Sequence, residues 1–251
     1  MTQTALSQKT AENTNEHVLK FNIKDGIISI AYYFYIIIIN YLSGLLCFKT
    51  TVYSDLMQFF NIHNEAFYRF IFFIPICVAQ IMPIFIWIKI RNQSLKSIGI
   101  RKDKILKSIV LGILFAIPFI TLPIIRALNQ NMHIMSSNQL LWSFLYYLLV
   151  IGFVEELIFR AFIQTRIQGL IKIKWISILV VAIMCSSMHI PFQMLKSNIP
   201  LNEFIPMYFI SLIYQSFMHI YLLYLYKKDN DIISVSTTHL LLNFIPSIFY
   251  I

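Results

Sequence analysis

Apolar segments long enough to cross a lipid bilayer recur along the whole chain, and they restrict its fold more than any other feature. A helix needs about 20 mostly apolar residues to span the hydrocarbon, since each residue rises about 1.5 Å. The fifth such segment is short, and Pro191 is expected to end it. Seven segments qualify: residues 27–48, 70–90, 108–125, 140 to about 166, 175 to about 189, 201–226 and 232–250.

The composition agrees with a bilayer as the main solvent. Hydrophobic residues make up 58% of the chain and charged residues 12%, with a mean hydropathy of +0.71. Soluble domains are about 45–50% apolar and about 25% charged. We therefore predict an all-α polytopic transmembrane helix bundle of about seven spans. Residues 26–251 would form one membrane domain, preceded by a flexible polar cytoplasmic tail over residues 1–25, which lacks the plan of a cleavable signal peptide.

The net charge of +9 is spread over the connections between apolar segments, without a basic face interleaved with aromatic residues. This pattern excludes nucleic acid as a partner and indicates membrane topology instead. Seven basic residues fill the connection over residues 89–107, which the positive-inside rule places in the cytoplasm. Sixteen of the twenty Lys and Arg then lie on that side, with the N-terminus, and four lie outside: Lys49, Arg69, Arg126 and Lys196.

The fourth apolar segment contains two adjacent acids, Glu155 and Glu156, followed by Arg160. An ionised group at mid-bilayer costs at least about 2.5–3.5 kcal/mol, so such groups usually face a protein interior or an aqueous cavity. Glu156 and Arg160 are four residues apart on a helix and are expected to form an ion pair. Glu155 points about 100° away and is left as the candidate general base. A buried cluster that only holds helices together is the competing interpretation.

Further polar side chains occur in two later segments. His189 ends the fifth segment, while His239 and Asn243 share one face of the last segment. Each alone is typical of a hydrogen-bonded core residue. Together with the first motif they suffice for hydrolysis, because a glutamate and a histidine can activate water while a histidine and an amide stabilise an oxyanion. Counting residues along the spans, we expect one cavity, open toward the cytoplasm.

These motifs resemble the membrane-embedded CAAX prenyl protease and bacteriocin-processing family, also described as Abi proteins. The family motif Glu-Glu-x-x-x-Arg is met by Glu155, Glu156 and Arg160. The second-motif histidine falls on His189, and the motif His-x-x-x-Asn is met by His239 and Asn243. The similarity covers about residues 140–246, the expected protease core. Cys185 stands where the family usually has an aromatic residue, which concerns local packing.

The resemblance implies an intramembrane, metal-independent glutamate endopeptidase that needs no cofactor. Glu155 and His189 would activate water, His239 and Asn243 would form the oxyanion site, and Glu156 and Arg160 would support them. The substrate would be a peptide or membrane protein. Bacterial relatives are associated with peptide maturation, bacteriocin immunity or surface-protein control, and a multi-pass protein of a bacterial plasma membrane is expected.

Three other interpretations fit the same residues. Glu155, His189 and His239 could bind zinc, although the chain has no His-Glu-x-x-His helix. Cys185 lies four residues before His189, so a thiolate nucleophile is conceivable, although a packed thiol is the better expectation for this and the other two cysteines. Finally, the same fold could serve as a non-catalytic membrane scaffold or regulator.

Overall fold

A computed structural model describes residues 21–101 and 104–250 of the chain, and most of the predicted tail, residues 1–20, lies outside this part. The first described helix begins at Ile23, three residues before the expected start of the membrane domain. The helices in this part of the chain are α2 (Ile23–Phe48), α3 (Val52–Phe59), α4 (Glu65–Ile90), the 3-10 turn η1 (Leu95–Ile98), α5 (Ile105–Asn129), α6 (Ser137–Leu145), η2 (Tyr146–Gly152), α7 (Phe153–Glu156), η3 (Leu157–Ile163), α8 (Gln164–Arg166), η4 (Ile167–Gly169), α9 (Lys174–Ser187), α10 (Ile190–Ser197), α11 (Leu201–Asp229) and α12 (Ile232–Ser247).

The predicted all-α polytopic bundle is confirmed. Six helical stretches of the described chain are long and apolar enough to cross a membrane, and the continuous stretch Ser137–Gly169 combines α6 to η4. The seventh expected span is the shorter helix α12, whose 16 residues extend about 24 Å. Apolar side chains of the outer helices face outward, as Leu122 and Leu128 of α5 show with 72% exposure each.

The fifth segment differs from its prediction. Helix α9 ends at Ser187, the chain turns at Met188 and His189, and α10 continues to Ser197. Pro191 lies in the first turn of α10, where proline is tolerated because its missing N–H has no partner in the helix. The prediction that Pro191 ends this segment is therefore wrong, and the apolar stretch reaches Ser197.

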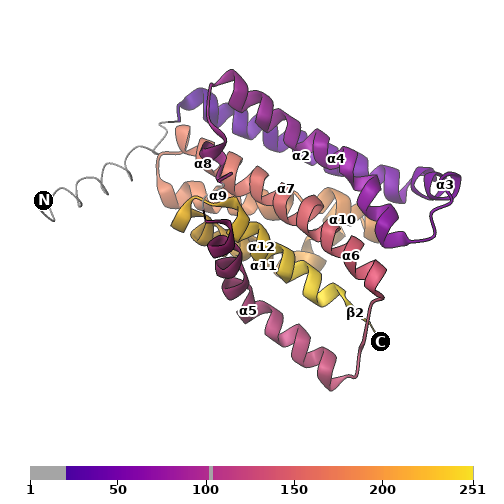
Figure 1. The fold of residues 1–251 in the computed structure, drawn as a ribbon. Coiled ribbons are helices and arrows are strands. Elements are labelled where there is room, and N and C mark those ends of the chain that lie inside the picture. Colours follow the sequence, from indigo (N-terminus) through magenta and orange to yellow (C-terminus); the bar gives the residue numbers. More distant parts are fainter. Residues whose placement is uncertain (1–20, 102–103, 251) are drawn as a thin grey trace, which may run out of the picture.

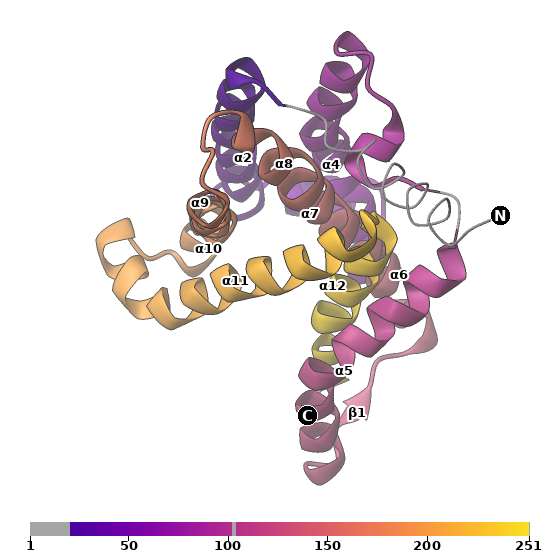
Figure 2. The ribbon, with the colours of Figure 1, turned by 90° about the vertical axis from the view of Figure 1, so that its left-hand side faces the viewer.

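Most long helices run along a common direction, from the left of Figure 1, where α2 begins, to the right, where α12 ends near the C-terminus. Helix α11 is the exception and crosses the others at a steep angle (Figure 2). At the right-hand end, the strand β1 (His133–Ile134) pairs antiparallel with β2 (Phe249–Tyr250) and ties the chain after α5 to the chain after α12.

Specific polar contacts fix the helices at the end where α2 begins. The side chains of Asn22 and Asp25 form a capping box at the start of α2. Asp25 also pairs with Arg91, at 3.1 Å, just after α4. Asp231 caps α12 by accepting hydrogen bonds from the N–H groups of Ile233 and Ser234.

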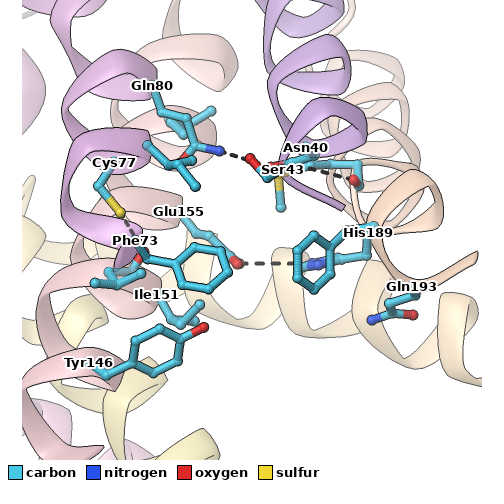
Figure 3. A pocket seen from close by; sticks show the side chains of 15 residues that line it. Asn40, Ser43, Phe73, Cys77, Gln80, Tyr146, Ile151, Glu155, His189 and Gln193 are labelled. Carbon is cyan, nitrogen blue, oxygen red and sulfur yellow. Dashed lines mark hydrogen bonds and ion pairs between the residues drawn. The ribbon is translucent and has the colours of Figure 1, made fainter. Parts of the chain in front are cut away.

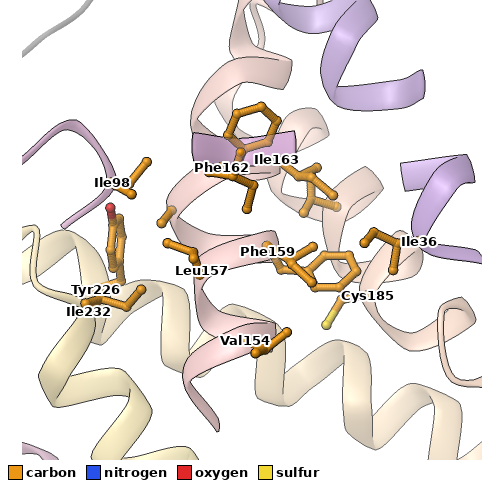
Figure 4. Close-up of a cluster of buried hydrophobic side chains, with 14 of the residues drawn as sticks. Ile36, Ile98, Val154, Leu157, Phe159, Phe162, Ile163, Cys185, Tyr226 and Ile232 are labelled. Atoms are coloured by element: carbon orange, nitrogen blue, oxygen red, sulfur yellow. The ribbon is translucent and has the colours of Figure 1, made fainter. Parts of the chain in front are cut away.

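The hydrophobic core surrounds the second half of the fourth stretch. Leu157, Phe159, Phe162 and Ile163 of η3 are at most 1% exposed. Figure 4 shows them packed between residues of α2, α9, α11 and α12. The same cluster includes Val150 and Val154, so packed core residues lie on both sides of the two glutamates along the chain.

Candidate active site

The turn that carries Glu155 and Glu156 has an unusual setting. Helix α7 is a single α-helical turn, with the π-helical segments η2 before it and η3 after it. Widened π turns within helices occur frequently at functional sites because they redirect side chains. The two glutamate side chains differ in exposure, with 13% for Glu155 and 0% for Glu156.

Glu156 lies at the centre of a buried charge cluster. Nη1 of Arg160 is 3.1 Å from Glu156 Oε1, so the ion pair expected from their spacing is present. His239 Nδ1 lies 2.6 Å from the same oxygen, a contact that the sequence did not predict. One carboxylate oxygen thus joins the fourth helical stretch to α12.

Glu155 faces the two histidines of the predicted set. Its Oε2 is 3.9 Å from His189 Nε2 and 3.8 Å from His239 Nε2. Figure 3 shows Glu155 and His189 pointing toward each other from different helices. Both separations are too long for a direct hydrogen bond, and they suit groups bridged by a water molecule.

The remaining residues are positioned by local backbone structure. His189 occupies the turn between α9 and α10, where its C=O accepts a hydrogen bond from Gln193 N–H. Asn243 lies one turn after His239 on α12, and its Nδ2 donates to the His239 carbonyl at 3.1 Å. The structure therefore brings together all six predicted residues from three apolar stretches.

A cavity of about 520 Å³ is lined by five of these six residues: Glu155, Arg160, His189, His239 and Asn243. Glu156 is not among its lining residues and supports the site from behind. Other polar side chains in the lining were not predicted to belong to the site: Arg69, Tyr146, Tyr147, Gln193, Lys196, Tyr214 and Gln215.

A smaller cavity of about 120 Å³ adjoins Glu155 and His189 and is lined in part by the N-terminal helices α2 and α4. Asn40 of α2 accepts a hydrogen bond from Gln80 of α4 at 2.8 Å, and both line this cavity (Figure 3). The N-terminal half, whose spans are merely compatible with the family resemblance, therefore contributes side chains to the cavity beside Glu155. The sequence did contain an indication of this role, because amide side chains within apolar spans, such as Asn40 and Gln80, need polar partners. Nothing in the sequence connected these two amides to Glu155.

The larger cavity opens toward the end of the bundle with few basic residues. Lys196 is the next-to-last residue of α10 and Arg69 lies in the second turn of α4, both at the end opposite to the start of α2. The core residues of η3, such as Phe159 and Phe162, fill the space between Glu155 and the basic end. The cavity therefore extends away from the basic end, where the sequence placed its opening, while the assignment of that end to the cytoplasm stays a prediction.

The two alternative enzymatic interpretations receive no geometric support. Within residues 21–101 and 104–250, no group of three His, Cys, Asp or Glu side chains is arranged to hold a metal ion. Cys185 is 3% exposed, and no hydrogen bond or ion pair found in this part of the chain joins its thiol to the His189 ring. A packed thiol describes Cys185 better than a nucleophile.

The fold and the site define a polytopic membrane protein with a carboxylate and two imidazoles gathered in an interior cavity. Residues 137–245 match the family model described as "Type II CAAX prenyl endopeptidase Rce1-like". The resemblance to the CAAX protease family is thus confirmed over a segment that contains all six site residues. Over this segment the chain is similar to membrane proteases of the CAAX type. No curated protein and no solved structure matches the chain.

Proposed function

We propose that this chain is a metal-independent intramembrane glutamate endopeptidase that cleaves a peptide or a membrane protein. The observation that carries the proposal is the position of Glu155, whose Oε2 faces Nε2 of both His189 and His239 inside a cavity. The match of residues 137–245 to a family of membrane endopeptidases supports the same conclusion. A bacterial plasma membrane, with a role in peptide maturation, bacteriocin immunity or surface-protein control, is part of this proposal.

The proposed reaction begins with a water molecule between Glu155 and His189. Glu155 takes a proton from this water. At the same time, the oxygen of the water attacks the carbonyl carbon of the scissile peptide bond. The tetrahedral intermediate then breaks its C–N bond, and the proton held by Glu155 passes to the leaving amine. The second proton of the water stays on the acyl product, so the products are a carboxylic acid, which then ionises, and an amine. No covalent bond to the protein forms.

Asn243 and His239 are placed to stabilise the developing oxyanion in different ways. The Asn243 amide has a second N–H besides the one bonded to the His239 carbonyl, so it can donate in any protonation state. With its Nδ1–H donated to Glu156, the His239 ring presents Nε2 to Glu155, and this atom donates only when the ring carries both protons. We therefore propose that Asn243 donates a hydrogen bond to the oxyanion in every protonation state of His239.

The test is the nearly isosteric change Glu155→Gln. Purified full-length protein in nanodiscs would be incubated with a proteome-derived peptide mixture, and new peptide termini would be counted by mass spectrometry. Because general-base catalysis contributes about 10²–10⁴-fold, cleavage should fall by that factor in Glu155→Gln. The same change at the exposed Glu203, at the start of α11, should leave cleavage unchanged.

Each remaining outcome identifies a different error. Equal cleavage by Glu155→Gln and the unaltered protein would refute the glutamate mechanism, and loss in Cys185→Ala alone would favour a thiolate. Activity abolished by EDTA and restored by zinc would establish a metallopeptidase. Absence of any detectable cleavage by the unaltered protein would favour the non-catalytic scaffold.

A further inference from the structure

Two basic residues line the large cavity without belonging to the proposed catalytic set. Arg69 comes from α4 and Lys196 from α10, at the end of the bundle where basic residues are otherwise rare. Counting charges along the sequence had assigned both to external connections. Both residues instead lie within helices and line the cavity, so a position in an external loop does not explain why they are there.

Arg69 is held in place without being neutralised. Its guanidinium carbon lies 4.5 Å from the centre of the Tyr146 ring and 5.8 Å from that of Tyr147. Its Nε is buried and has no hydrogen-bond partner, and no carboxylate of the described chain lies within ion-pair distance. A guanidinium stacked on an aromatic face keeps its N–H edge available for a carboxylate.

The charges that line the cavity do not balance. Arg160 is paired with Glu156 behind the wall, which leaves Glu155 as the acid that lines the cavity together with Arg69 and Lys196. Lys196 is exposed at the opening and forms no ion pair with another described residue. Because Arg69 and Lys196 have no acidic partner among the described residues, the cavity has an excess of positive charge and favours a ligand that brings negative charge.

We propose that Arg69 and Lys196 bind a carboxylate of the substrate while its scissile peptide bond lies at Glu155. This inference rests on the proposed endopeptidase function and adds the class of substrate, an acidic peptide segment. The cavity volume of about 520 Å³ lies within the range of about 300–1,000 Å³ typical of ligand sites. The carboxylate belongs either to the peptide C-terminus or to an Asp or Glu side chain.

The experiment uses peptides cleaved in a Glu155-dependent manner from the proteome-derived mixture. Each would be resynthesised with its C-terminus free or amidated, and with acidic residues intact or changed to Asn or Gln. Steady-state kinetics would compare the unaltered protein with Arg69→Gln, Lys196→Gln and Arg126→Gln. Arg126 is the matched control, because it lies near the same end of the bundle but outside this cavity.

For peptides with the recognised carboxylate, Arg69→Gln and Lys196→Gln should each lower kcat/KM about tenfold or more, mainly through a higher KM, because a hydrogen bond to a charged group is lost. The amide forms should bind equally weakly to all four proteins. If amidation of the C-terminus removes the difference in kcat/KM between these proteins, the recognised carboxylate is the C-terminal one. If a change of Asp or Glu to its amide removes that difference, the recognised carboxylate belongs to a side chain.

Equal losses on acid and amide peptides would show that Arg69 and Lys196 have a structural role, and no loss would show no role at all. Either result overturns carboxylate recognition and leaves the endopeptidase function standing. Absence of any Glu155-dependent cleavage would instead overturn the endopeptidase function, and with it this inference.

Discussion

Adjacent glutamates occupy two different environments in this site. Glu155 borders a cavity and lies 3.8–3.9 Å from two imidazole nitrogens, whereas Glu156 is fully buried against Arg160 and His239. Removing one member of a buried ion pair leaves an uncompensated charge, whereas a partly exposed carboxylate can be neutralised at little cost. The chemistry proposed for Glu155 therefore depends on a neighbour whose own role is structural.

At the residue scale, we expect Glu156→Gln to destabilise the protein and Glu155→Gln to leave stability almost unchanged. In the Glu156→Gln variant, the oxygen of the new amide could still accept the His239 N–H, but Arg160 would lose its counter-charge. The free energy of unfolding should fall by about 3–5 kcal/mol, measured by SDS titration of the purified protein in mixed micelles. A larger loss for Glu155→Gln than for Glu156→Gln would contradict this division of roles.

Helix α12 is the element that completes the site, and two glycines allow it to lie close to its neighbours. A Cβ at Gly112 of α5 would be 2.5 Å from the Ser234 carbonyl oxygen, and one at Gly152 would be 3.1 Å from that of Ser236. Thr238 Oγ1 donates to the Gly112 carbonyl at 2.9 Å and anchors α12 one residue before His239. Small residues serve this purpose in membrane bundles because they let helix backbones approach closely.

At the element scale, Gly112→Ala should move α12 away from α5 and displace His239 from Glu156. Overpacking of this kind costs about 1–3 kcal/mol, and cleavage of the peptide mixture should fall with it. The neighbouring change Ile113→Ala is the control, because Ile113 is 43% exposed on the outer face of the same helix. If both variants retained full stability and activity, the close approach of α12 would not be what positions His239.

At the scale of the whole molecule, the distribution of charge and the position of the cavity together define the side from which substrate arrives. Basic residues gather at the end where α2 begins, which the positive-inside rule assigns to the cytoplasm. The cavity opens at the other end, beside Arg69 and Lys196. The substrate would then be a segment that has already crossed the membrane.

This orientation predicts a labelling pattern in a chain whose three native cysteines are replaced by alanine. A membrane-impermeant maleimide should label Lys196→Cys in intact cells, but label Lys107→Cys only after the membrane is permeabilised. Lys107 is exposed near the start of α5 and serves as the matched position at the basic end. The reverse pattern would place the cavity on the cytoplasmic side.

Local patterns along the chain were sufficient for the class of fold and for the residues of the first motif. Apolar segments of about 20 residues predict membrane-spanning helices. In lipid, a single segment can form hydrogen bonds with all its backbone N–H and C=O groups only as a helix. The spacing of Glu156 and Arg160 on one helix predicts their ion pair, which is present at 3.1 Å. These features depend on residues within a few turns of each other.

Contacts between distant helices decided the rest. The bond from His239 to Glu156, the amides Asn40 and Gln80 beside Glu155, and the position of Arg69 in the wall join segments far apart in the chain. Residue spacing carries no information about such contacts, because it does not fix how helices tilt and pack. For the same reason the direction in which the cavity opens followed only from the packed core on one side of Glu155 and the basic residues on the other.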